Sequence, residues 1–329
     1  MMEGKFMVKK LLFMVIVLMV SVSILACSGE IQDEVQESEQ ELEQEQITDE
    51  SQEADEQLGY PMTITDSYDR QVTIESRPQR VISLAPSVTE TIFAIHAEHL
   101  LVGRTEFCDF PREVERIDTV GTLQEPNLER IVELDPDLVI VSTHFRPELI
   151  ERFEDLGINL VGFYGDGVFE GVYVTIEQIG KVLGYEDRSQ MIVGMLKNQV
   201  EDIKEAVDGR PRPEVYYVLG YGKGGDFTAG SDTFIGKMIE MAGGLNSASD
   251  VEGWSYSLEK LLENDPDILI CSKYFDAKEG IMNTNGYKDL RAVKEGDLYP
   301  IDNNLLDRQG PRLADGLYEL AKIIHPDAF

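Results

Sequence analysis

Residues 127–140, NLERIVELDPDLVI, decide the fold, because the chain repeats them at residues 257–270 as SLEKLLENDPDILI. Each copy holds Leu-Glu and a basic residue, two apolar residues and Glu, and then Asp-Pro-Asp before an apolar run. A match of this length indicates internal duplication. In each copy the pattern predicts a short helix that leads into a strand, with Ile131 and Val132 facing the core in the first copy.

Around the two copies, short apolar runs alternate with amphipathic stretches, which is typical of an α/β fold with parallel sheets. Ser87 and Glu90 have the spacing of a capping box and predict a helix start. The predicted strands are residues 81–84, 100–102, 137–141, 160–163, 215–219, 268–271 and 298–301. The predicted helices are residues 128–134, 147–156, 174–183, 188–207, 233–241, 258–262 and 312–324, besides the one at Ser87.

One predicted helix, residues 188–207, is much longer than the others and separates the two alternating halves. Its apolar residues are spaced three or four apart, at Ile192, Met195, Leu196, Val200, Ile203 and Val207. Two Rossmann-like α/β lobes joined by one long helix are therefore expected. Because ligands bind beyond the carboxyl ends of parallel strands, a ligand cleft is expected between the lobes.

The N-terminus predicts export and attachment to a membrane. Lys5, Lys9 and Lys10 precede an apolar run that ends at Ala26, and Cys27 follows, as in bacterial lipoprotein signals whose Cys is lipidated. A transmembrane anchor is the alternative, because the run nearly spans a bilayer. Both interpretations place the rest of the chain outside the cytoplasm.

The expected organisation has five parts. A signal peptide at residues 1–26 precedes an acidic tether at residues 27–59, which holds thirteen acidic and no basic residues and is expected to stay disordered. The N-terminal lobe, the connecting helix and the C-terminal lobe are expected at residues 60–187, 188–209 and 210–329.

Composition argues against some partners. The chain has 62 acidic and 29 basic residues and a net charge of −33, which disfavours nucleic acid and anionic membrane surfaces as partners. Cys108 and Cys271 are the other two cysteines, and two buried thiols are favoured over a disulfide. No zinc-type spacing of Cys and His is present, and no cofactor or metal site is expected.

Four segments resemble the substrate-binding proteins of ABC importers for iron-siderophores, haem and cobalamin. They are residues 80–87 (RVISLAPS), 127–140, 232–246 (DTFI through AGGLN) and 308–312 (RQGPR). The resemblance covers residues 61–329 and implies the class III periplasmic-binding-protein fold. It also implies docking to an ABC permease with its ATPase subunits, through Glu129 and Glu259, which are equivalent members of the repeat.

The resemblance and the loops after the predicted strands together indicate a ligand site. Residues 106–111 (EFCDFP) resemble an aromatic loop of the cobalamin-binding members, although Leu123 stands where those members carry a tryptophan. His144 and Tyr164 are residue types that could ligate haem or ferric iron. The full set of ligand-binding candidates is Phe107, Phe110, Leu123, His144, Tyr164, Tyr221, Trp254, Tyr256 and Arg308.

The function expected from this resemblance is capture of a metal chelate outside the cytoplasm and its delivery to an importer. A corrinoid such as cobalamin ranks slightly ahead of ferric siderophores, and haem ranks third. An exported enzyme and a ligand sensor on the same scaffold are the other classes considered. The chain has no Gly-x-Ser-x-Gly, no His-Glu-x-x-His and no phosphate loop, so no catalytic residues are assigned.

Overall fold

The computed structural model describes residue 55 and residues 58–329, apart from residues 144 and 166. Residues 62–329 form one compact unit, and both parallel sheets belong to it. Cys27, the predicted signal peptide and most of the acidic segment lie outside the described residues. In the part of the chain that is described, no helix is long and apolar enough to cross a membrane.

The first sheet is parallel and carries the first copy of the repeat. Its strands lie in the order β4-β3-β5-β6, and β3 and β5 are buried along their whole length, as expected for strands covered on both faces. The strands are β3 (Val81–Ser83), β4 (Leu101–Arg104), β5 (Leu138–Val141) and β6 (Leu160–Gly162). The helices are α2 (Pro86–Ala94), α3 (Leu128–Glu133), α4 (Ile150–Asp155) and α5 (Phe169–Val182).

The second sheet is also parallel and carries the second copy. Its strands lie in the order β10-β9-β7-β8. They are β7 (Glu214–Val218), β8 (Leu245–Asn246), β9 (Ile268–Ser272) and β10 (Leu298–Ile301). The helices are α7 (Phe234–Met241), α8 (Leu258–Asn264), α9 (Ala277–Asn283), α10 (Arg291–Glu295), α11 (Asn304–Asp307) and α12 (Leu313–Ile324). Two α/β lobes, as predicted, therefore follow one another along the chain.

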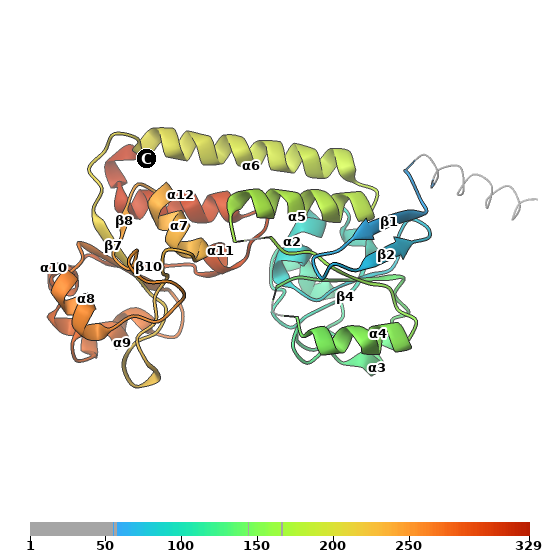
Figure 1. Ribbon diagram of the computed structural model, residues 1–329, viewed down its shortest axis with the longest axis horizontal. Coiled ribbons are helices and arrows are strands. Elements are labelled where there is room, and N and C mark those ends of the chain that lie inside the picture. Colours follow the sequence, from blue (N-terminus) through green and yellow to red (C-terminus); the bar gives the residue numbers. More distant parts are fainter. Residues whose placement is uncertain (1–54, 56–57, 144, 166) are drawn as a thin grey trace, which may run out of the picture. The chain divides into compact units, whose positions relative to one another are not determined.

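Helix α6 (Glu186–Val207) packs against both α5 and α12, so it contacts a helix that follows the first sheet and the helix that closes the second lobe (Figure 1). Four of its predicted inward residues, Leu196, Val200, Ile203 and Val207, are buried. Met195 is exposed instead, which corrects the sequence-based expectation, because the buried stripe continues through Val193.

The repeat is confirmed in structure. In each lobe a short helix, α3 or α8, leads into the strand that pairs with the first strand of the sheet, β5 beside β3 and β9 beside β7. Asp135 and Asp265 follow the two helices and both lie in the left-handed region, with φ of 46° and 42°. Because this conformation recurs at equivalent positions, the two copies share backbone geometry as well as sequence.

Two further local predictions were wrong. Val132 was expected in the core, but its side chain is 49% exposed, while Ile131 is fully buried. Ser87 does not cap α2, whose N-cap is Ala85 and whose first turn starts at Pro86. Glu90 is directed to an ion pair instead of to the helix start.

Smaller elements complete the unit of residues 62–329. A hairpin that the sequence analysis did not predict, β1 (Met62–Thr65) with β2 (Gln71–Ile74), pairs antiparallel ahead of the first sheet. The 3-10 helices are η1 (Glu98–Leu100), η2 (Arg112–Arg116), η3 (Pro147–Leu149), η4 (Gly222–Gly224), η5 (Tyr287–Asp289) and η6 (Pro326–Ala328).

Candidate ligand-binding site and contacts between the lobes

Each sheet has one point where successive strands are added on opposite sides. In the first sheet this point lies between β3 and β5, and in the second it lies between β7 and β9. Loops that follow adjacent strands diverge there, and parallel α/β sheets bind ligands in that opening. The candidate site is therefore sought among the loops that follow the strands of both sheets.

The loop after β4 presents two aromatic side chains to solvent. Phe107 is 60% exposed and Phe110 is 44% exposed, although both are large apolar residues. Between them Cys108 points inward, where its thiol lies 3.1 Å from the hydroxyls of Thr89 and Thr105. Burial raises the pKa of the Cys108 thiol, so it stays protonated. The buried thiol fixes the loop, and the phenyl rings on either side are left accessible.

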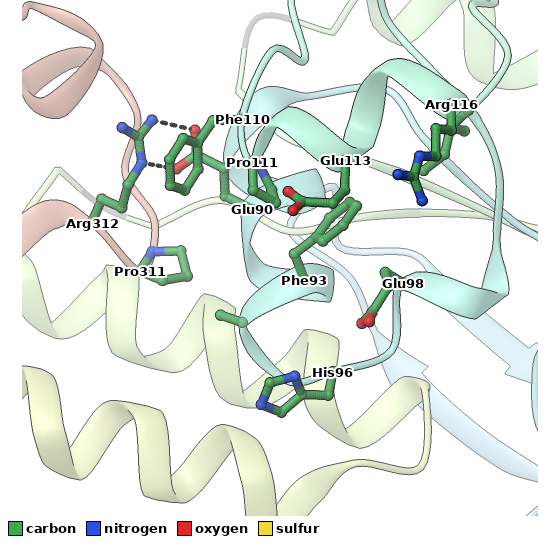
Figure 2. A pocket seen from close by; sticks show the side chains of 12 residues that line it. Glu90, Phe93, His96, Glu98, Phe110, Pro111, Glu113, Arg116, Pro311 and Arg312 are labelled. Atoms are coloured by element: carbon green, nitrogen blue, oxygen red, sulfur yellow. Dashed lines mark hydrogen bonds and ion pairs between the residues drawn. The ribbon is translucent and has the colours of Figure 1, made fainter.

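A charged cluster connects the lobes directly beside this loop. Glu90 on α2 is buried, with a side chain 2% exposed, and it receives hydrogen bonds from two arginines that follow the second sheet. Arg312 donates to both carboxylate oxygens, at 2.8 and 2.6 Å, and Arg308 donates to one at 2.9 Å. Figure 2 shows the paired bonds between Glu90 and Arg312.

The same cluster holds the aromatic loop. Arg308 also donates to the Asp109 carboxylate at 2.6 Å and to the Phe107 carbonyl at 3.3 Å. Burial by itself lowers the pKa of Arg308, but the bonds to Asp109 and Glu90 outweigh burial and raise that pKa. The Arg312 guanidinium lies 3.9 Å from the centre of the Phe110 ring, a cation–π contact visible in Figure 2.

A cavity of about 680 Å³ adjoins this cluster and is lined by residues of both lobes (Figure 2). Phe93 and Phe110 contribute aromatic surface, and Pro311 comes from the segment that precedes α12. Phe110 is the one sequence-predicted ligand residue among those that line this cavity.

The other described candidates of the first lobe are engaged in contacts within that lobe. The Tyr164 hydroxyl donates to the Ser67 carbonyl at 2.6 Å, and its ring meets Tyr68 edge-on. Leu123 is half-buried against the core of this lobe. His144 lies outside the described residues.

The candidates of the second lobe differ in accessibility. Trp254 is 43% exposed, and its carbonyl accepts a hydrogen bond from the Thr228 N–H. Tyr221 is half-buried, with its ring 6.1 Å from that of Tyr287. Tyr256 belongs to the core, where its hydroxyl donates to the Ser247 carbonyl, so it leaves little surface for a ligand. Phe275, in the loop after β9, is the most exposed of the large apolar residues described.

Sequence reasoning did not find the ion-pair role of Glu90, Asp109 and Arg312. The signal was present, because Glu90 lies three residues after segment 80–87 and Arg312 ends segment 308–312, but the spacing of Ser87 and Glu90 favoured a helix cap. Cys108 and Cys271 are both free and buried, as favoured. Among the described residues, no group of three or more His, Cys, Asp or Glu could hold a metal ion.

Glu129 and Glu259 lie in the first turns of α3 and α8. Both side chains are exposed. Their basic neighbours are engaged elsewhere, since Arg130 pairs with Asp118 and Glu133, and Lys260 pairs with Asp250. The two glutamates therefore occupy equivalent, open positions on the two lobes.

Two parallel-sheet lobes with accessible aromatic loops at the strand ends define a bilobed solute-binding protein. Residues 81–305 match the family described as periplasmic binding protein, and the chain belongs to that family. Members of this family act outside the cytoplasm as binding proteins.

Named relatives agree with this assignment. An uncharacterised ABC transporter substrate-binding lipoprotein of Bacillus subtilis, YvrC, is 31% identical over 287 residues, which cover 82% of this chain and 87% of the relative. A cobalamin-binding protein of Halobacterium salinarum is 28% identical, over 83% of this chain and 76% of the relative. The crystal structure of a periplasmic haem-binding protein from Pseudomonas aeruginosa is 27% identical, with a TM-score of 0.68 over 77% of this chain and 94% of that one.

Proposed function

We propose that this chain is the substrate-binding lipoprotein of an ABC importer and that it captures a metal chelate, a corrinoid ahead of a ferric siderophore. The observation that carries the proposal is the set of exposed aromatic side chains in loops of both lobes. Phe107 and Phe110 follow β4 in one lobe, and Trp254 and Phe275 belong to loops of the other. Large, mostly apolar ligands with a few polar groups bind to surfaces of this kind.

The names of the relatives support a metal chelate as the ligand. Which chelate is bound has to be distinguished by experiment. The Halobacterium relative is named for cobalamin and the Pseudomonas structure for haem, so haem is the alternative ligand. Arg308 is a weak candidate for contacting an anionic chelate, because its donors already serve Glu90, Asp109 and the Phe107 carbonyl.

The chain is proposed to bind its ligand without converting it and to be held at the membrane through lipidated Cys27. Binding is the whole role expected of a receptor that hands its ligand to a permease and its ATPase subunits. Mass spectrometry of the mature N-terminus tests the anchor. A diacylglyceryl group on Cys27 is expected, and an unprocessed N-terminus would contradict the lipoprotein assignment.

Tryptophan fluorescence tests the ligand class, because Trp254 is the single tryptophan of the chain. The full-length protein in detergent is titrated with cyanocobalamin, haemin and a panel of ferric siderophores, with correction for the light that these compounds absorb. Saturable quenching by one compound is expected, with calorimetry on the same panel as a check. If no chelate binds by either method, the proposed ligand class is wrong.

Docking to the permease is proposed to use Glu129 and Glu259. Glu129→Ala combined with Glu259→Ala is expected to leave chelate affinity unchanged and to abolish uptake, because neither acid is a candidate ligand residue and both are open to a basic partner. Uptake of labelled chelate by cells that carry the variant measures this. Glu148→Ala with Glu279→Ala, two other exposed acids, is the matched control. Normal uptake by the first variant would refute the docking role.

A further inference from the structure

The duplicated helices expose a matched apolar residue beside each docking glutamate. Val132 and Leu262 occupy equivalent repeat positions, three residues after Glu129 and Glu259, and they are 49% and 40% exposed. Residues three apart on a helix are neighbours on its surface. Each lobe thus presents an acid with an apolar side chain at its side.

In the first lobe the apolar surface extends into a groove. A hollow of about 590 Å³ lies between α3 and α4, and its exposed apolar residues are Val132 and Leu156. Its lining residues are Leu128, Glu129, Val132, Glu133, Arg152, Asp155 and Leu156. Three of the four charged residues in this lining are acidic, so the groove favours a partner that is basic around an apolar centre.

In the second lobe the exposed apolar residue of α8 is Leu262 and not Leu258 at the start of the helix. Leu258, at the start of α8, lies close against Gly286, where an added Cβ would come within 2.7 Å of a Leu258 methyl group. Leu262, one turn further along, remains open to solvent. The apolar contact available on this lobe is therefore Leu262 itself.

We infer that the permease contact is made by acid and apolar side chains together: Glu129 with Val132 and Leu156, and Glu259 with Leu262. This inference rests on the proposed function and extends it to the chemistry of the partner. The occupant is the membrane subunit pair, and each subunit presents a basic side chain flanked by apolar ones. The duplication argues for this partner, because two equivalent patches on one chain match a two-fold symmetric pair of subunits.

Energetics give the apolar residues their role. An exposed ion pair contributes little and is weakened by salt, so two glutamates orient the partner without holding it tightly. The free energy gained when apolar side chains are buried is roughly proportional to the area removed from water. It is much less sensitive to salt than the energy of an ion pair. Most of the affinity is therefore assigned to Val132, Leu156 and Leu262.

The test compares apolar substitutions on the docking patches with matched ones elsewhere. Val132→Ser with Leu262→Ser is expected to weaken binding of the full-length chain to the nanodisc-embedded importer by about tenfold or more. Met191→Ser with Met195→Ser, on the exposed face of α6, is the control and is expected to bind as the wild type does. Chelate affinity and the melting temperature are measured for both, and both are expected to stay unchanged.

The outcomes separate this inference from the proposed function. Equal importer affinity of the serine variant and the wild type would overturn the inference alone. Loss of nearly all importer binding at high salt in the wild type would overturn it too, because the contact would then be ionic. A wild-type chain that engages no importer would overturn the proposed function and the inference together.

Discussion

At the scale of single residues, the Glu90 carboxylate accepts three hydrogen bonds from two arginines of the other lobe. It is nearly inaccessible to water, so the arginines replace the hydration that the charge lost on folding. The same arginines hold Asp109 and Phe110 of the aromatic loop. One buried acid thus links lobe packing to the position of the proposed ligand contacts.

Glu90→Gln is expected to lower the free energy of unfolding by about 3 kcal/mol, because two guanidinium groups lose their buried counter-charge. Urea unfolding followed by circular dichroism measures the change. Glu98→Gln, on an exposed acid that lines the neighbouring cavity, is the control and is expected to change stability by about 0.5 kcal/mol or less. Equal stabilities for the two variants would show that the cluster contributes little.

The two buried thiols give a second prediction at this scale. Burial raises the pKa of Cys108 and raises that of Cys271 to about 11, so the reactive thiolate is scarce at both sites near neutral pH. Iodoacetamide at about pH 8 is expected to leave both unmodified in the native protein and to modify both in urea. Peptide mass spectrometry measures the labelling, and rapid native labelling of either cysteine would contradict the buried geometry.

At the scale of elements, the repeat performs the same structural task twice. Asp137 accepts hydrogen bonds from the backbone N–H groups of Gln79 and Arg80, just before β3. Asp267 accepts one from the Glu214 N–H, at the start of β7. Each copy of Asp-Pro-Asp therefore ties the strand it precedes to the first strand of its sheet.

Asp267 supplies a pH-dependent prediction. The hydrogen bond from Arg291, and then that from the Glu214 N–H, hold the Asp267 pKa below its usual value. The folded state thus favours the carboxylate, and its stabilisation is present above a pH of about 4 and is lost as the pH falls through the folded pKa. Because the Asp267 side chain is 42% exposed and its ion pair is screened by solvent, the effect is small.

The free energy of unfolding of Asp267→Asn is expected to differ from that of the wild type most at neutral pH and least near pH 3. Urea unfolding across that range measures the difference. In an Arg291→Ala background most of the difference is expected to disappear, because the principal partner is gone. A difference that grows toward acidic pH would contradict the assigned sign.

Helices and strands could be predicted from the sequence where a single spacing of apolar residues dominated a segment. Short runs such as residues 138–141 are apolar throughout and favoured buried strands, and the spacing at Leu196 and Val200 located the connecting helix. Element ends and single faces were less predictable, as Val132 and Met195 show. In a helix of two turns or along a wide apolar stripe, tertiary packing decides which neighbour is covered.

At the scale of the whole molecule, the two-lobed plan could be read from the duplicated segment, but contacts between the lobes could not. Glu90 and Arg312 are separated by 222 residues, and no local pattern pairs them. For the same reason Tyr256, close to Trp254 in sequence, was expected at the ligand surface although the fold places it in a core. Phe107 in one lobe and Trp254 in the other are both accessible, as are Phe110 and Phe275.

We propose that loops of both lobes hold one chelate, and calorimetry of Phe107→Ala and Trp254→Ala tests this proposal. Cyanocobalamin is titrated first into the full-length wild type and each variant, and then the other chelates. Each single substitution is expected to weaken binding of the same chelate by about tenfold, because each ring is lost from a different lobe. Wild-type affinity in either folded variant would contradict capture between the two lobes.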